Sequence, residues 1–119
     1  VVKGHSSCGA IGLALQNETG HSVGSITGKI RKAVEACQCG AQHPPAGQAL
    51  LEQVTRRNIE NSLAEIINGS AFLRERIARG EMGLVGAYHD IATRTVHFGT
   101  LVTADDFDRY RDAGTGLAA

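Results

Sequence analysis

The residues best able to do chemistry in this sequence lie within its first ten positions. His5 and Cys8 are separated by two serines and follow the apolar pair Val1 and Val2. Imidazole nitrogen and thiolate sulfur are donor atoms that zinc prefers, and a tetrahedral zinc site needs at least three protein ligands. The HxxC spacing therefore predicts half of a metal site, with at least one further ligand elsewhere.

The pattern around these two residues predicts a strand, a tight turn and a helix. Residues 1–4 form an apolar run that ends in Gly, which is typical of a short buried strand, and residues 8–15 are typical of a short helix. Open α/β sheets hold their ligands at the carboxyl ends of strands. His5 and Cys8 are therefore expected where an α/β fold places its site.

The middle of the chain predicts helices separated by loops. A stretch rich in Gly, Ser, Thr and Asn predicts a loop over residues 17–28, and apolar spacing predicts a short helix within 26–37. The longest periodic segment predicts a helix over 47–67, ended by Asn68-Gly69. Ser70 is then the expected N-cap of a second helix.

The last third of the chain predicts a hairpin. Residues 82–88 are short and apolar, 91–94 are expected to turn, and 95–100 alternate as a second strand. Side chains alternate across a strand, so Val96 and Phe98 are expected to face the core and His97 the other side. An acidic pair at 105–106 is expected to cap a last helical turn that contains Phe107 and Tyr110.

Composition indicates a single globular domain and argues against a nucleic-acid or membrane partner. The chain has 119 residues, of which 42% are hydrophobic and 20% charged, as in one ordinary globular domain. Twelve basic residues balance twelve acidic ones, which argues against nucleic acid or an anionic membrane as a partner. No apolar run approaches the roughly 20 residues that a membrane span needs. The expectation is a cytoplasmic protein with no membrane contact.

The cysteines leave an alternative open. Cys8, Cys37 and Cys39 form an odd set, which argues against a disulfide-stapled fold and fits a reducing compartment or a metal. Cys37 and Cys39 are interpreted as ordinary or redox-sensitive loop thiols. The alternative is a closed Cys3His structural site that they form with His5 and Cys8.

Other polar residues have alternative interpretations. His21 and His43 are interpreted as solvated loop histidines, with proton transfer as the alternative. Asn58, inside the long helix, faces either the site or a subunit interface, or else solvent. The adjacent His89 and Asp90 are not interpreted as a ligand pair, because neighbouring strand residues point to opposite faces.

Several of these features together resemble the beta-class carbonic anhydrases. The resemblance rests on residues 4–10 (GHSSCGA), Asn58 and residues 86–91 (GAYHDI), and it covers residues 1 to about 99. It implies an α/β fold with a mostly parallel central sheet flanked by helices and a C-terminal hairpin strand. It also implies homodimers or larger homo-oligomers and the reversible hydration of carbon dioxide to bicarbonate.

The resemblance also implies a ligand set. In that family one His and two Cys bind Zn²⁺, and His5 and Cys8 match the second and third of these ligands. Gly9 is interpreted as a substrate-binding position that needs close backbone approach. The first zinc Cys belongs to a CxDxR-like motif whose Asp and Arg form the catalytic dyad.

No CxDxR occurs in these residues, so no catalytic residue is assigned. The sequence is interpreted as one incomplete domain, the carboxyl-terminal part of the family fold, with doubtful activity as an isolated chain. The alternative is a non-catalytic zinc-binding or dimerisation module. A further departure is Arg94, which stands where the family usually has a hairpin Gly and makes a turn with positive φ costlier.

Overall fold

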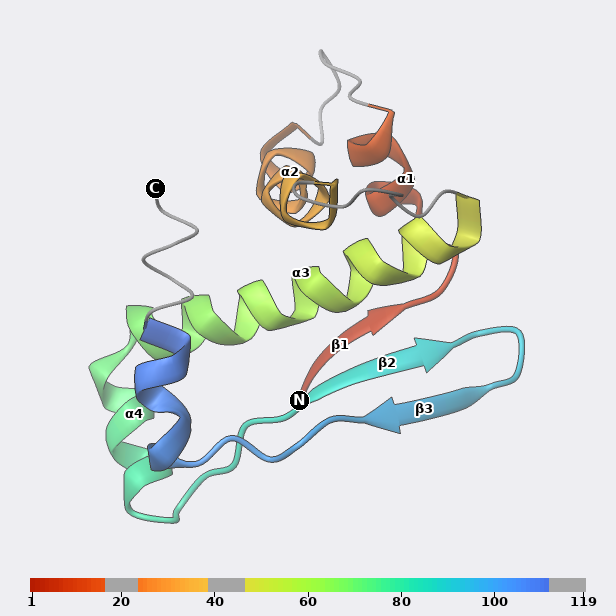
Figure 1. Ribbon diagram of the computed structural model, residues 1–119. Helices are drawn as coiled ribbons and strands as arrows, with labels where there is room; N and C mark the ends of the chain where they lie inside the picture. Colours follow the sequence, from red (N-terminus) through yellow and green to blue (C-terminus); the bar gives the residue numbers. More distant parts are fainter. Residues whose placement is uncertain (17–23, 39–46, 112–119) are drawn as a thin grey trace.

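The computed structural model describes residues 1–16, 24–38 and 47–111, which form a small sheet with helices packed on one side (Figure 1). No helix in these parts of the chain is both long and apolar enough to cross a membrane. The elements in chain order are β1 Val2–His5, α1 Gly9–Leu15, α2 Gly24–Gln38, α3 Gly47–Gly69, α4 Ala71–Ala78, β2 Gly86–Asp90, β3 Thr95–Phe98 and the 3-10 helix η1 Ala104–Asp106.

The sheet has β2 in the middle. β1 pairs with β2 in parallel, and β3 pairs with β2 in antiparallel fashion as the second arm of a hairpin. The predicted α/β class and the C-terminal hairpin are confirmed. One of the two pairings is parallel, so the described sheet is mixed.

Helix α3 connects the two halves of the core, as Figure 1 shows. Its buried residues Ile59, Leu63 and Ile67 are four positions apart and pack with the sheet and α4, whereas Val54 packs with α1 and α2. The exposed Arg56, whose Nε lies 2.9 Å from Glu52 Oε1, lies over the Tyr88 ring on the sheet side of the helix. One cluster of buried residues joins α3 to α4 and the sheet, and another joins it to α1 and α2.

The ends of α4 follow the sequence prediction. Ser70 has an extended backbone, and its hydroxyl accepts a hydrogen bond from the Leu73 N–H at 3.2 Å. This bond satisfies one of the orphan donors at the helix start. Gly80 follows the helix with a φ of +72°, a conformation that Gly adopts without steric cost.

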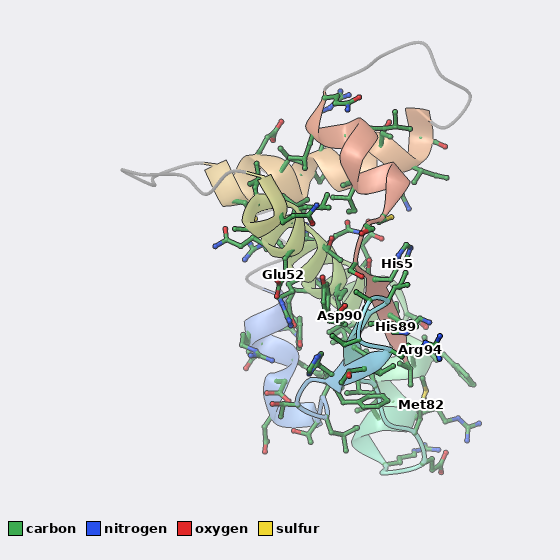
Figure 2. The ribbon with its side chains drawn as sticks, turned by 90° about the vertical axis from the view of Figure 1, so that its right-hand side faces the viewer. His5, Glu52, Met82, His89, Asp90 and Arg94 are labelled. Carbon is green, nitrogen blue, oxygen red and sulfur yellow. The ribbon has the colours of Figure 1, made fainter. Side chains whose placement is uncertain are left out.

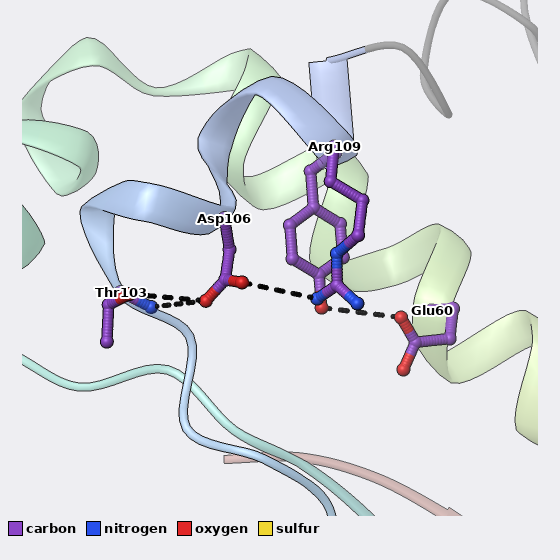
Figure 3. Close-up of polar contacts among 5 residues, drawn as sticks. Glu60, Thr103, Asp106 and Arg109 are labelled. Carbon is purple, nitrogen blue, oxygen red and sulfur yellow. Dashed lines mark hydrogen bonds and ion pairs between the residues drawn. The ribbon is translucent and has the colours of Figure 1, made fainter.

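Polar contacts hold the C-terminal helical turn against α3 (Figure 3). Asp106 Oδ2 accepts the backbone N–H of Thr103 at 2.9 Å, as in a capping box, and Arg109 lies 3.8 Å from Asp106. The Tyr110 hydroxyl donates to Glu60 Oε2 at 3.3 Å. The expected acid-capped turn is confirmed, with Thr103 as the N-cap residue.

Two local predictions are wrong. Residues 24–28 were expected in a loop, but α2 begins at Gly24 because Thr27 and Ile30 are buried in its packed face. Val96 and Phe98 were expected in the core, but they are 38% and 65% exposed.

The reason for the second error lies in the register of the sheet. His97 is paired with Tyr88, which packs in the core beneath α3, whereas Val96 and Phe98 are on the opposite face. No described helix covers that face (Figure 1). The alternation of side chains was therefore predicted correctly, but the assignment of sides was reversed.

Candidate metal centre

Two glycines allow α3 to approach the strands that end at the site. A Cβ atom on Gly4 would lie 2.8 Å from Ile59 Cδ1 and 2.9 Å from Thr55 Cγ2. A Cβ atom on Gly86, in the neighbouring strand, would lie 2.8 Å from Ile59 Cγ2. Gly within a strand often marks such close packing. The helix therefore fixes β1, and with it the residue that follows Gly4.

His5 is the last residue of β1, and its ring is held by the backbone. Its Nδ1 lies 2.8 Å from the carbonyl oxygen of Ser6. A carbonyl oxygen can only accept, so Nδ1 is the protonated nitrogen in the neutral ring, and Nε2 keeps its lone pair. Metal-binding histidines commonly donate their other ring N–H in this way, which fixes the tautomer and the ring orientation. The half-buried His5 is thus prepared to bind a metal through Nε2.

The turn after His5 is tied to the end of β2. The Ser6 N–H donates to the carbonyl of His89, and the Ser6 hydroxyl accepts from the Ile91 N–H, each at 2.9 Å. Ser7 has a φ of +55°, which is unusual for a residue other than Gly. These bonds and this conformation bring the chain from β1 into α1 within three residues.

Cys8 is the N-cap residue of α1. Its carbonyl accepts the Gly12 N–H at 3.1 Å, and its side chain makes no capping hydrogen bond. The thiol is free and half-buried, so its sulfur remains available as a ligand. Around the next residue, Gly9, no described atom lies within 4 Å of a Cβ position. Packing within the described chain does not require Gly there, and its substrate role stays a prediction.

The described residues supply part of a zinc site. His5 offers one nitrogen and Cys8 one sulfur, which are suitable donors for tetrahedral zinc. No group of three or more His, Cys, Asp or Glu residues in the described ranges could hold a metal ion. The two donors therefore fit zinc chemically, and a third protein ligand has to come from elsewhere.

Other predicted residues lie apart from these donors or outside the described ranges. Cys37 packs against the cluster that joins α1, α2 and α3, and burial raises the pKa of its thiol, an effect that Arg57 partly opposes. A raised pKa is typical of a structural thiol rather than a reactive one. Cys39, His21 and His43 lie outside the described residues, and so does any Cys3His site that includes Cys39.

The hairpin residues beside the site have structural partners. His89 is the register partner of His5, and both lie at the same end of the sheet (Figure 2). Its Nδ1 is 3.4 Å from Lys3 Nζ. Asp90 Oδ1 accepts the N–H groups of Ala92 and Thr93 at 3.1 and 3.3 Å, which stabilises the turn. The nearness of His89 was missed because it depends on strand register.

Comparison with known proteins identifies the family to which the chain belongs. The family model described as carbonic anhydrase matches residues 1–96, which include β1, the turn with His5 and Cys8, and the start of β3. The chain therefore belongs to the carbonic anhydrase family, and within it to the beta class. A search of curated proteins gives no match.

Proposed function

We propose that His5 and Cys8 are two of three protein ligands of a zinc ion, in a protein that interconverts carbon dioxide and bicarbonate. The observation that carries this proposal is the hydrogen bond between His5 Nδ1 and the Ser6 carbonyl, which leaves Nε2 free, three residues before a Cys8 side chain that makes no capping hydrogen bond. Membership of the carbonic anhydrase family supports the reaction class.

The role of this chain is to position the two donors. When bound, zinc supplies Lewis acidity that lowers the pKa of water from about 15.7 to about 7. Gly4 and Ile59 fix the strand that carries His5, and Ser6 fixes the turn that carries Cys8. Two donors do not complete a tetrahedral protein site, so the proposal includes a cysteine from a CxDxR-like motif outside these residues.

Metal content tests the ligand assignment directly. We expect whatever zinc or cobalt the purified protein carries to be bound through His5 and Cys8, with cobalt giving a thiolate charge-transfer band. His5→Ala and Cys8→Ala should each abolish stoichiometric metal, because each removes a ligand. Zinc retained at wild-type stoichiometry in both variants would refute the assignment.

Two matched controls separate ligand loss from misfolding. His97 lies on the other face of the sheet from His5, and Cys37 lies in α2. His97→Ala and Cys37→Ala should therefore keep the metal content of the parent chain. Loss of metal in all four variants would point to unfolding, which circular dichroism of each variant would reveal.

Activity distinguishes the enzyme from the non-catalytic module. The described residues provide two ligands and the 119 residues hold no CxDxR, so we expect hydration by this chain to be about 100-fold slower, or more, than by a complete family member. Stopped-flow measurement gives this rate. A rate equal to that of a complete enzyme would contradict the need for the missing motif.

The encoding frame gives a further test of the proposal. A CxDxR-like motif after an apolar strand, upstream of Val1, would support the enzyme. A frame without it would favour the zinc-binding or dimerisation module. We also propose that the protein forms a homodimer, as the family resemblance implies, and sedimentation at several protein concentrations tests this separately.

A further inference from the structure

A second candidate site lies on the helical side of the molecule. A groove of about 1170 Å³ is bounded by α2, α3, the start of α4 and the helical residues 107–111. No residue of β1, α1 or the sheet lines it, so it is separate from His5 and Cys8. Bicarbonate is far smaller than this volume, which is at the upper end of the range for drug-sized ligands.

The charges around the groove favour an anion. The lining contains four basic residues and one acidic residue, although the whole chain has no net charge. Glu65 lies 3.9 Å from Lys29 Nζ and Asp108 Oδ1 lies 3.5 Å from Arg111 Nη1, so two of the four have an acidic partner. The other two are Lys32 and Arg74. A concave surface with an excess of one charge concentrates ligands of the opposite charge.

Two polar side chains held in place by the fold lie along the groove. Asn61 Nδ2 is buried and has no hydrogen-bond partner among the described residues, and Asn61 lines the groove. Arg74 Nη1 donates to the carbonyls of Ile67 and Asn68, which fixes the guanidinium at one end of the groove.

The groove also has an apolar part. Ile26 of α2 is 52% exposed, and the half-buried Phe107 lies in the lining as well. Inorganic phosphate could meet the basic side chains but could not cover these apolar groups. The ligand that satisfies both kinds of lining is an organic anion with an apolar ring.

We propose that the groove between α2, α3 and residues 107–111 binds a small organic phosphate that carries an apolar or aromatic ring. The phosphate contacts the basic residues, of which Lys32 has no ion pair among the described residues. The ring packs on Ile26 and Phe107. This site is independent of the zinc ligands.

Titration with two probes tests the proposal on the full chain. ADP and 1-naphthyl phosphate carry both chemical features, whereas adenosine, 1-naphthol and inorganic phosphate carry one each. We expect at least one of the two probes to bind at least 10-fold more tightly than its uncharged counterpart and than inorganic phosphate, by calorimetry at low salt. Added salt should weaken it, because the contacts are exposed. Failure of both probes to bind would overturn the proposal.

Charge reversal locates the binding. Lys32→Glu should weaken the bound probe at least 10-fold. Lys3→Glu is the matched control, because Lys3 is an exposed lysine of β1 outside the groove, and it should leave binding unchanged. Equal affinity in Lys32→Glu and the parent, or equal weakening in Lys3→Glu, would refute the site. Binding should persist in His5→Ala, so failure of the zinc assignment would not affect this result.

Discussion

Gly4 and Ile59 are packed so closely that a side chain on the strand residue would require Ile59 to move. An added Cβ would lie 2.8 Å from Ile59 Cδ1, a separation that real Cβ atoms essentially never show. Gly4 immediately precedes His5, so the packing of α3 on β1 determines where the proposed ligand lies. The glycine before the histidine thus has a physical role that does not involve the metal itself.

Gly4→Ala should destabilise the protein. Overpacking of a close contact typically costs about 1–3 kcal/mol. We expect a loss of that size in the free energy of unfolding by urea, together with weaker metal binding because His5 is displaced. Gly28→Ala is the control, since Gly28 is inside α2 and no described atom lies within 4 Å of its Cβ position. Gly28→Ala should stabilise the helix by about 0.5–1 kcal/mol. An unchanged free energy of unfolding in Gly4→Ala would contradict the close packing of Gly4 on Ile59.

Arg94→Gly should stabilise the hairpin. Arg94 has a φ of +59°, a conformation that costs a residue with a Cβ roughly 1–2 kcal/mol and costs Gly little. Gly also increases the entropy of the unfolded chain, so the net gain should be about 0.5–1 kcal/mol. Thr93→Gly, beside it, has no positive φ to relieve and should destabilise. Urea unfolding of both variants checks the pair, and a loss of stability in Arg94→Gly would show that the Arg side chain contributes more than its backbone costs.

Periodicity predicted the helices well because it records a local property. The apolar periodicity of α3 and the capping hydroxyl of Ser70 both depend on residues close together in the sequence. The helix and its cap were therefore predicted from spacing and residue type. The start of α2 was missed because Gly, Ser and Thr also occur in loops. In this part of the chain, the packing of Ile30 into the core stabilises the helix.

Sequence patterns could not identify relationships that depend on strand register. The pairing of His5 with His89, and the exposure of Phe98, follow from which residue of one strand faces which residue of the next. Alternation in β3 identifies two faces but not which of them α3 covers. His5 and Cys8 could be identified as candidate donors from sequence because only two residues separate them, and their role as ligands stays a prediction. Gly86 could have been identified as a close-packed position from its place in a strand.

Phe98→Ser should have little effect on the stability of the isolated chain. Phe98 is 65% exposed, so its replacement removes little buried apolar area, and we expect a change within about 0.5 kcal/mol. Leu63→Ala, at the centre of the core, is the contrast and should cost about 2–5 kcal/mol. Unfolding measured at several protein concentrations checks both. A large, concentration-dependent loss in Phe98→Ser would mean that a second copy covers this face.

High pH should destabilise the protein through its tyrosines. The sequence contains two, Tyr88 and Tyr110, and burial raises the pKa of each above the ordinary value of 10.0, with Glu60 adding to the effect at Tyr110. A raised pKa in the folded state means that the native protein holds the proton more tightly than the unfolded chain. The stabilisation is complete below pH 10 and is lost as pH rises through the folded-state pKa.

Spectrophotometric titration checks this prediction, because only these two side chains give the tyrosinate signal. The native protein should titrate at higher pH than the urea-unfolded chain. Tyr110→Phe should leave a single native transition from Tyr88 and should reduce the loss of stability at alkaline pH. It also removes the hydrogen bond to Glu60 Oε2, so a cost of about 0.5–1.5 kcal/mol is expected at neutral pH. Identical native and unfolded titration curves would contradict the burial of both hydroxyls.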